Sequence, residues 1–268
     1  MSDERQVVKA QDDAHGVGHD YVKGSPHLRH AALRGDIEAR LERLVKAAIA
    51  RTGRCHVLEI GAGHGTFTQT LVDAGAEVTV TEASQASADH LRQAFAGDNR
   101  VEVVYDEVGD GVLSGTGSWD LVVMISVIHH IPDYLDFLRR LQPRISEGGA
   151  FFSVQDPLFY PRRSKLSHLA SRGSYFAWRL AQGDYRRGIA TRVRRLRGVY
   201  DETAESDLVE YHVVREGCDE EAIRRQLAEH FDVEIFTYWS SQGPFFQRLF
   251  AGTGLRSDFG VEAVANRA

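Results

Sequence analysis

Three glycines at alternate positions lie between a short apolar run and a helical pattern. They are Gly61, Gly63 and Gly65, and the flanking segments are residues 56–60 and 66–74. Glycine lets the backbone turn sharply and lets a ligand approach it closely, and the amides at a helix start favour negative or electron-rich groups. The segment therefore predicts a nucleotide-binding turn between a strand and a helix. A tight turn without a ligand is the alternative.

An acid closes the next strand-like run. Glu82 stands about twenty residues after the glycines, where a carboxylate can accept hydrogen bonds from both hydroxyls of a ribose. Enzymes that bind NAD place an acid there too, but their glycine spacing is GxGxxG. Here Gly65 comes one residue early, and Thr66 takes the place of the last glycine. The pattern therefore predicts a ribose and disfavours NAD.

Two adjacent histidines follow the most apolar segment of the chain, residues 121–125. Such a segment predicts a strand buried on both faces, and open α/β sheets bind ligands at the carboxyl ends of their strands. Ser126, His129 and His130 are then expected at the ligand edge. Because histidine titrates near neutral pH, we expect His129, and after it His130, to act as a base or to contact a substrate. Capping or packing is the alternative role.

Segments of strand and helix character alternate along the chain. Strand patterns cover 56–60, 77–81, 101–105, 120–126, 150–154, 233–239 and 260–265, and helical patterns cover 36–50, 66–74, 87–96, 134–142 and 220–229. This alternation predicts a mostly parallel sheet with helices on both faces. The last two strands lack a regular crossover helix, which favours an antiparallel C-terminal strand. The expected fold class is a Rossmann-like, doubly wound α/β sheet of seven strands.

The alternation also divides the chain into four segments. Residues 1–34 are an N-terminal cover segment, 35–156 the nucleotide-binding core, 157–215 a helical lid insertion and 216–268 the C-terminal completion of the core sheet. The lid segment is rich in arginine, serine, glycine and aromatic residues. We expect its aromatic side chains to pack lid helices together or to line an apolar pocket. They are Phe159, Tyr160, Tyr175, Phe176, Trp178 and Tyr185.

The composition narrows the function classes. Of 268 residues, 43% are hydrophobic and 26% charged, which is enough apolar material for a core. The net charge of -6 gives no global attraction to nucleic acid or anionic membranes, so any such binding needs a local patch. Cys55 and Cys218 lie in no metal-ligand spacing, so no metal site is expected. Without an apolar leader or a membrane-length apolar run, we expect a soluble cytoplasmic protein.

Four segments together resemble successive motifs of class I S-adenosylmethionine-dependent methyltransferases. They are LEIGAGHG at 58–65, TVTEAS at 79–84, WDLVVMISVIHHIPD at 119–133 and LQPRISEGGAFF at 141–152. The resemblance covers about half the chain and is greatest to the branch that acts on quinones and natural products. It implies S-adenosylmethionine as the cofactor and a small-molecule methyl acceptor. A hydroxyl of a secondary metabolite is the preferred acceptor.

The resemblance also implies roles for single positions. Glu59 with Gly61, Ala62, Gly63 and Gly65 would hold the methionine part, Glu82 with Ala83 the ribose, Asp106 with Glu107 the adenine, and Ser126 the cofactor at the end of the fourth strand. Surface acids in a turn are an equal alternative for Asp106 and Glu107. Tyr21, in the segment before the first helix, would fold over the cofactor or simply pack.

Other polar and aromatic residues are weaker candidates. Tyr211 and His212 stand where the lid segment returns to the sheet, so a substrate-facing role is a hypothesis beside core packing. We expect His15, His19 and His27 to be exposed rather than functional.

Several other functions stay open. Transfer to nitrogen or carbon would use the same cofactor site. An RNA methyltransferase would use the basic run at 186–197, for which a solvated helix face is the alternative. An NAD-dependent oxidoreductase lacks a Tyr-x-x-x-Lys pair after the fourth strand, and a regulator would bind cofactor without turnover. We expect a small-molecule partner, with no membrane and with nucleic acid disfavoured, and a homodimer stays open.

Overall fold

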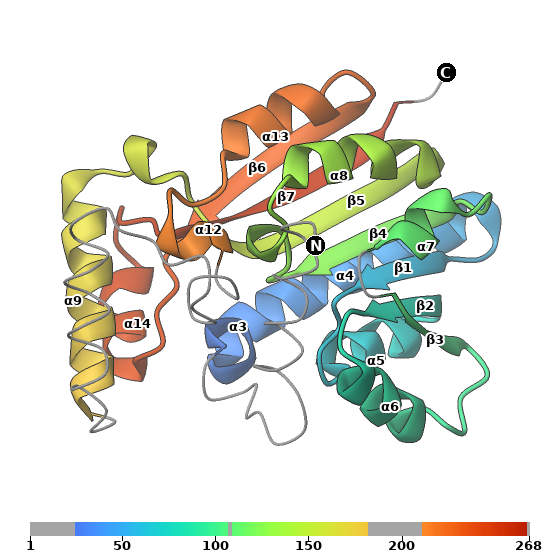
Figure 1. Ribbon diagram of the computed structural model, residues 1–268, viewed down its shortest axis with the longest axis horizontal. Helices are drawn as coiled ribbons and strands as arrows, with labels where there is room; N and C mark the ends of the chain where they lie inside the picture. The colour runs from blue at the N-terminus through green and yellow to red at the C-terminus, as the bar shows by residue number, and fades with distance from the viewer. Residues whose placement is uncertain (1–24, 107–108, 182–210, 267–268) are drawn as a thin grey trace, which may run out of the picture.

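The computed structural model describes residues 25–106, 109–181 and 211–266. Its strands are β1 (His56–Ile60), β2 (Glu77–Glu82), β3 (Val101–Tyr105), β4 (Trp119–Ile125), β5 (Ile145–Pro157), β6 (Phe231–Tyr238) and β7 (Asp258–Ala265). They form one seven-stranded sheet in the order β3-β2-β1-β4-β5-β7-β6 (Figure 1). The first five strands pair in parallel, and β7 runs antiparallel to both of its neighbours. The structure thus confirms the predicted Rossmann-like, doubly wound sheet with an antiparallel C-terminal strand.

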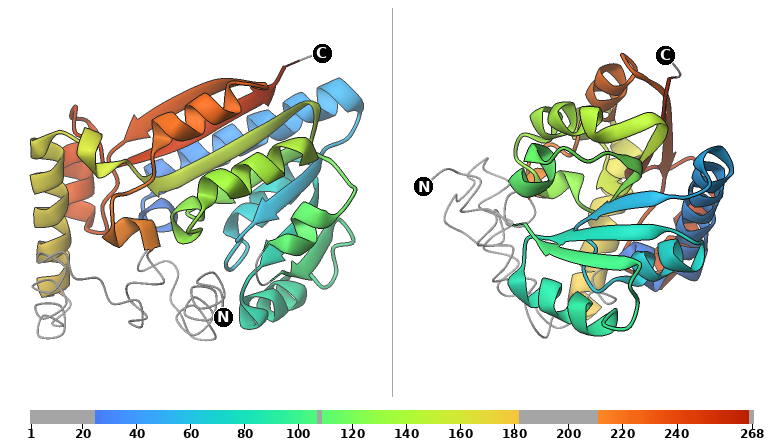
Figure 2. Two further views of the ribbon diagram at one scale, coloured as in Figure 1. Left: turned by 45° about the horizontal axis from the view of Figure 1, so that its top comes forward. Right: turned by 90° about the vertical axis from the view of Figure 1, so that its right-hand side faces the viewer.

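The α-helices lie on both faces of this sheet. They are α3 (Pro26–Arg29), α4 (Ala31–Thr52), α5 (Thr66–Asp73), α6 (Gln85–Ala94), α7 (Asp110–Ser114), α8 (Tyr134–Leu141), α9 (Lys165–Ala181), α12 (Tyr211–Val214), α13 (Glu220–Leu227) and α14 (Pro244–Ala251). Single 3-10 turns are η1 (Ile128–His130), η2 (Gln142–Arg144) and η3 (Tyr160–Arg162). Figure 2 shows α4 on one side of the sheet and α8 on the other.

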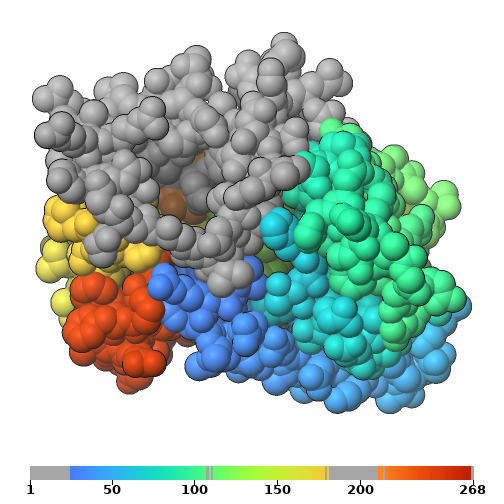
Figure 3. Space-filling view, turned by 90° about the horizontal axis from the view of Figure 1, so that it is seen from below, coloured from blue at the N-terminus to red at the C-terminus, as the bar shows by residue number. Residues whose placement is uncertain are grey.

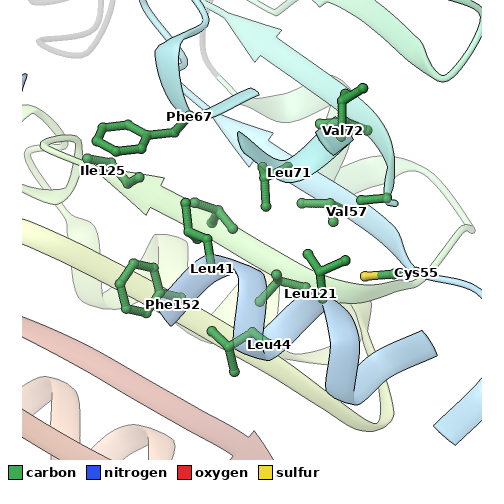
Figure 4. Close-up of a cluster of buried hydrophobic side chains, with 14 of the residues drawn as sticks. Leu41, Leu44, Cys55, Val57, Phe67, Leu71, Val72, Leu121, Ile125 and Phe152 are labelled. Carbon is green, nitrogen blue, oxygen red and sulfur yellow. The ribbon is translucent and has the colours of Figure 1, made fainter. Parts of the chain in front are cut away.

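Two hydrophobic clusters divide the side chains of the sheet between its faces. Along β4, Leu121 and Val123 belong to the cluster under α4 and α5, whereas Val122 and Met124 belong to the cluster under α8 and α13. Successive strand residues point to opposite faces, so a strand apolar at every position supplies both clusters. Figure 4 shows part of the first cluster, where the α4 side chains meet those of β4. The pattern that predicted a doubly buried strand is therefore confirmed.

Several element boundaries differ from the sequence prediction, and one helix was not predicted. The helix expected at 36–50 runs from Ala31 to Thr52 and ends at Gly53, whose left-handed backbone (φ 81) caps it. The strand expected at 150–154 runs from Ile145 to Pro157, because β5 pairs with both β4 and β7. Before β7 lies α14, which we did not predict from the sequence. Its eight residues are too short for a clear period, and Phe250 holds it against Trp239 at a ring distance of 5.0 Å.

The lid and the N-terminal cover are described only in part. Residues 1–24 and 182–210 lie outside the described ranges, so the division of the chain into four segments stays a prediction. In the described part of the lid segment, α9 lies beside α14 at one end of the molecule (Figures 1 and 2). No described helix combines the length and the apolar character that crossing a membrane requires.

Candidate active site

The glycine turn connects β1 to α5 in a backbone conformation that favours glycine. Gly61, Gly63 and Gly65 have φ angles of 71, 58 and 80, in the left-handed region that favours glycine. A Cβ on Gly61 would lie 2.7 Å from a methyl group of Val127, and one on Gly65 would lie 2.8 Å from Leu91. The Gly61 amide donates to the Thr81 carbonyl at 2.8 Å. The turn is thus fixed to β2 and presents backbone to its surroundings.

Two buried carboxylates lie beside this turn. Glu59 of β1 accepts a hydrogen bond from the Thr68 hydroxyl at 2.6 Å, and Glu82 of β2 accepts one from the Gly63 amide. Burial raises the pKa of Glu59 to about 7 and that of Glu82 to about 8. Each carboxyl therefore holds a proton more readily than usual near neutral pH. A ligand that donates hydrogen bonds or carries positive charge would stabilise the ionised forms.

The acid after β3 is engaged by the backbone. The Asp106 carboxylate accepts from the amides of Gly111 at 3.3 Å and Val112 at 3.0 Å, at the start of α7. The Asp106 amide donates to the Glu82 carbonyl at 3.0 Å, which places Asp106 at the carboxyl edge beside the acid of β2. This arrangement matches an acid in a turn, one of the two roles expected for it. Glu107 lies outside the described residues, so the adenine contact of this pair stays a prediction.

A strained residue and a short turn follow β4. Ser126 has a φ of 61, which is uncommon for a residue with a side chain, and its amide donates to the Val154 carbonyl at 2.8 Å. The turn η1 then places the His129 and His130 rings 4.0 Å apart. His129 is buried, with 5% of its surface exposed. The two predicted histidines therefore lie together at the carboxyl edge, as expected from the sequence.

A buried aspartate holds His129. The Asp156 carboxylate lies 2.8 Å from Nδ1 of His129 and also accepts from the His129 amide at 3.1 Å. Its other oxygen accepts from the Ser153 hydroxyl at 2.9 Å. Burial raises the pKa of Asp156 to about 7, an effect that these hydrogen bonds oppose. With the proton on Nδ1 and donated to Asp156, Nε2 is the basic nitrogen of His129.

An irregularity in β5 positions Asp156. The register between β5 and β7 shifts between Val154 and Asp156, and Gln155 has a φ of 71. Bulges of this kind turn a side chain out of the regular alternation of a strand. The core segment expected from the sequence ends at Asp156, but no role was predicted for this residue. Its position two residues after the last predicted strand residue is a signal that could have found it.

His27 corrects an expectation. The sequence led us to expect an exposed side chain, yet His27 is buried, with 6% of its surface accessible, and its ring stacks on Phe67 at 6.0 Å. Pro26 starts α3 at this point, and both Pro26 and His27 are buried residues of that short helix. Burial, and then the charge of nearby His129, lower the pKa of His27 to about 3. Its Nδ1 has no hydrogen-bond partner within the described ranges.

His212 lies against the loop that follows the two histidines. Its Nε2 is 3.0 Å from the Ile131 carbonyl and 3.1 Å from the Pro132 carbonyl, and the Tyr134 ring meets it edge-on at 4.9 Å. This contact fastens α12 to the loop after His130. The guanidinium carbon of Arg215 lies over the Tyr211 ring, 3.7 Å from its centroid. A direct substrate contact for Tyr211 or His212 stays a prediction.

Other predicted residues fall in the segments that the structure does not describe. Tyr21, His15, His19, Tyr185 and the basic run 186–197 lie outside the described residues. Within the described parts of the chain, no cluster of three or more His, Cys, Asp or Glu side chains is arranged to hold a metal ion. Cys55 and Cys218 are both buried free thiols.

The sequence matches known proteins over a segment that includes the glycine turn, the acid of β2 and the paired histidines. Residues 58–151 match a family model described as a methyltransferase domain. The highly reducing polyketide synthase stpks1 of Strobilurus tenacellus is 34% identical over 107 residues, which are 37% of this chain and 4% of that protein. The ubiquinone biosynthesis O-methyltransferase of Vibrio parahaemolyticus serotype O3:K6 is 25% identical over 100 residues, 37% of this chain and 43% of that protein. The chain thus matches less than half the length of either relative.

A solved structure shares the fold over nearly the whole chain. The N-methyltransferase NodS from Bradyrhizobium japonicum WM9, in complex with S-adenosyl-L-homocysteine, has a TM-score of 0.53 at 13% identity. The comparison covers 99% of this chain and 100% of that one. At this identity the likeness concerns the arrangement of strands and helices. The family match adds the segment from β1 to β5, where the glycine turn, the acid of β2 and the paired histidines lie.

Proposed function

We propose that this chain, whose residues 58–151 are a class I S-adenosylmethionine-dependent methyltransferase domain, transfers a methyl group to a hydroxyl of a small secondary metabolite. The observation that carries the hydroxyl acceptor is the hydrogen-bonded pair of His129 and Asp156 at the carboxyl edge of the sheet. Methylation of a hydroxyl releases its proton, so a base beside the oxygen assists the reaction. The names of the relatives add support, since one is an O-methyltransferase and another a polyketide synthase.

The groups around the glycine turn fit S-adenosylmethionine by their chemistry. Glu59 and Glu82 are acids that gain from positive charge or donated hydrogen bonds, which an ammonium group and ribose hydroxyls bring. The backbone from Gly61 to Gly65 would lie against the methionine part, where added side chains would collide with the protein. When bound, the cofactor supplies an electrophilic methyl group on its sulfonium. The turn and the two acids hold and orient it.

In this proposal, His129 accepts the proton that the acceptor hydroxyl releases, and Asp156 stabilises the protonated ring. Nε2 of His129 takes the proton of the acceptor hydroxyl as the oxygen becomes nucleophilic. Asp156 keeps the ring oriented through Nδ1 and stabilises the imidazolium that forms, as a carboxylate partner of histidine does. Because the His129 amide and the Ser153 hydroxyl also bond to Asp156, the carboxylate is fixed from two sides. This preorganisation lowers the rearrangement needed when charge develops.

His27 would complete the wall of the acceptor site. It lies on α3, where its ring stacks on Phe67 of α5, the helix that follows the glycine turn, and the charge of His129 contributes to the lowering of its pKa. Burial keeps its imidazole neutral, so it serves as a hydrogen-bonding wall rather than as a base. The stacking of His27 on Phe67 fixes the ring plane. An acceptor with an aromatic ring and a second polar group would fit this mixture of imidazole and phenyl surfaces.

The test is a methyl-transfer assay with a matched pair of variants. Purified protein is incubated with methyl-labelled S-adenosylmethionine and panels of phenols, amines and carbon nucleophiles, and products are identified by mass spectrometry. Asp156→Asn should lower kcat for a phenol at least about tenfold while leaving the affinity for S-adenosylhomocysteine unchanged. Asp120→Asn is the control, since Asp120 is also buried but pairs with Arg51. Methylation confined to amines or carbon would overturn the hydroxyl acceptor.

A further inference from the structure

Exposed apolar side chains gather at one end of the molecule. Seven of the nine large hydrophobic residues exposed in the described parts of the chain lie on α9 and α14. They are Leu166 (63%), Leu169 (69%), Tyr175 (41%), Phe176 (46%), Leu180 (46%), Phe245 (69%) and Leu249 (51%). Single exposed apolar residues are ordinary, but a concentration of this kind marks an interaction surface. We call these seven side chains the α9–α14 face.

The α9 helix has polar residues toward the protein and apolar residues outward, the reverse of an ordinary surface helix. Its buried positions include Ser167 and Ser174, each with 3% of its surface exposed. The Ser167 hydroxyl accepts from the Arg256 amide at 3.2 Å, which attaches the helix to the segment after α14. The outward positions Leu166, Leu169, Phe176 and Leu180 follow a spacing of three, seven and four residues and so share one side. A surface helix whose outer side meets water presents the opposite pattern, with apolar residues toward the protein and polar residues outward.

The α14 helix shows the same inversion. Gln247 is buried, accepts from the Ser241 amide at 2.9 Å and donates to the Trp239 carbonyl at 3.0 Å. Phe245 and Leu249, on either side of it in sequence, are exposed. Figures 1 and 2 show α9 and α14 side by side, and Figure 3 shows their side chains adjoining on one face, in yellow and red. Both helices therefore expose apolar side chains at the same end of the molecule.

The charge beside these apolar side chains is positive. The sequences of α9 and α14 contain Lys165, Arg172, Arg179 and Arg248 but neither aspartate nor glutamate, although the whole chain carries a net charge of -6. Lys165, Arg172 and Arg248 are exposed. A second copy docked by a twofold axis would bring these like charges together across the interface. An anionic partner, by contrast, complements both the apolar side chains and the cations beside them.

We propose that the α9–α14 face binds the surface of an anionic lipid bilayer. Apolar side chains with lysine and arginine beside them are suited to the boundary between headgroups and acyl chains, where the cations meet phosphates. The seven exposed side chains of this face are mostly hydrocarbon. A specific protein interface needs hydrogen-bonding groups at fixed positions, whereas a fluid lipid surface does not. The lipid surface is independent of the proposed acceptor.

Vesicle flotation tests this inference with the full chain. Vesicles of equal parts phosphatidylcholine and phosphatidylglycerol are compared with vesicles of phosphatidylcholine alone. The wild type should float with the anionic vesicles and much less with the neutral ones. Leu169→Glu/Phe245→Glu should lower the bound fraction at least about tenfold, and Lys165→Glu/Arg172→Glu should lower it similarly. Arg54→Glu/Arg139→Glu changes net charge equally on other surfaces and should bind like the wild type.

Two further measurements keep the result interpretable. Each variant should retain the wild-type affinity for S-adenosylhomocysteine, which separates lost lipid binding from a failure to fold. Sedimentation equilibrium without lipid should give the same mass for the wild type and for Leu169→Glu/Phe245→Glu. No flotation of the wild type with anionic vesicles would overturn the proposal. So would a wild-type dimer that these two substitutions dissociate, since a second copy would then cover the face.

Discussion

The two halves of the candidate site are built in different ways. The central part of the cofactor half is the turn between β1 and α5 with the acids of β1 and β2, and these groups lie within residues 59–82. The acceptor half pairs His129 from η1 with Asp156 from β5, and our proposal adds His27 from α3. The first half depends on backbone conformation, and the second on side chains brought together from distant segments. Substitutions in the two halves should therefore fail in different ways, one in cofactor affinity and the other in turnover.

The largest loss of activity is expected from a substitution in the acceptor half. His129→Ala should lower kcat by about 10² to 10⁴, because the base that takes the acceptor proton is lost. Affinity for S-adenosylhomocysteine, measured by calorimetry, should stay close to that of the wild type. His56→Ala is the control, since His56 lies on β1 at the opposite edge and pairs with Glu77. An unchanged kcat for His129→Ala would remove the base from the mechanism.

A smaller effect is expected in the cofactor half. Gly61→Ala combines a positive φ with a Cβ 2.7 Å from Val127, and should weaken S-adenosylhomocysteine binding about tenfold or more. Gly53→Ala is the matched control, because Gly53 also has a positive φ (81) but lies at the end of α4, where an added Cβ would meet no atom within 4 Å. Both variants should lose some thermal stability. Equal cofactor affinity in the two variants would show that the turn does not bind the cofactor.

His27→Ala sharpens the description of the acceptor half. The proposed role of His27 is that of a neutral wall and not of a base, so its loss should lower kcat/KM about three- to tenfold, mainly through KM. Cofactor affinity should not change. His27→Asn, which keeps a polar group of smaller size, should restore part of the effect. A fall in kcat as large as that of His129→Ala would instead give His27 a part in the proton transfer.

The smallest effect is expected in how strongly S-adenosylhomocysteine stabilises the folded protein at different pH values. Burial raises the pKa of Glu59 and Glu82 from the ordinary 4.5 to about 7 and about 8. Between pH 4.5 and these raised values the folded state binds more protons than the unfolded state. The free energy of unfolding that these two groups contribute therefore falls as the pH rises through this range. A ligand that favours the ionised carboxylates should relieve this effect.

Calorimetric melting with and without S-adenosylhomocysteine measures this relief. The increase in Tm should be about 2–4 °C larger near pH 8.5 than near pH 6. Glu82→Gln should reduce the difference, whereas Glu77→Gln, at an exposed position of the same strand, should not. An equal increase at both pH values would mean that the ligand does not engage the buried acids.

The difference between the cofactor half, built from neighbouring residues, and the acceptor half, built from distant segments, also explains which residues the sequence could predict. The glycine turn and Glu82 are visible because their spacing is local and each residue type has one physical reason. Asp156 is not visible, because its role depends on a bulge in β5 and on a histidine 27 residues away. His27 was expected to be exposed, since nothing in its neighbours in sequence shows that α3 folds over Phe67. Long-range packing sets these positions, and local patterns do not contain it.

The two longest helices in the described parts of the chain show a second limit of what a sequence pattern can predict. In α4 the apolar residues Ile37, Leu41 and Leu44 face the sheet and are buried. In α9 the apolar stripe faces outward, and serines face the protein. A helical period shows that one side of a helix is apolar, but it does not show what covers that side. The tertiary structure shows that the apolar side of α9 is exposed, and our proposal is that a lipid surface covers it.

The most direct test of the central claim is a calorimetric titration of the purified chain with S-adenosylhomocysteine and, separately, with NAD. We expect saturable binding of S-adenosylhomocysteine, weakened by Gly61→Ala and unaffected by His129→Ala, and no saturable binding of NAD. Binding of NAD in preference to S-adenosylhomocysteine, or the absence of any heat with the latter at millimolar concentration, would contradict it.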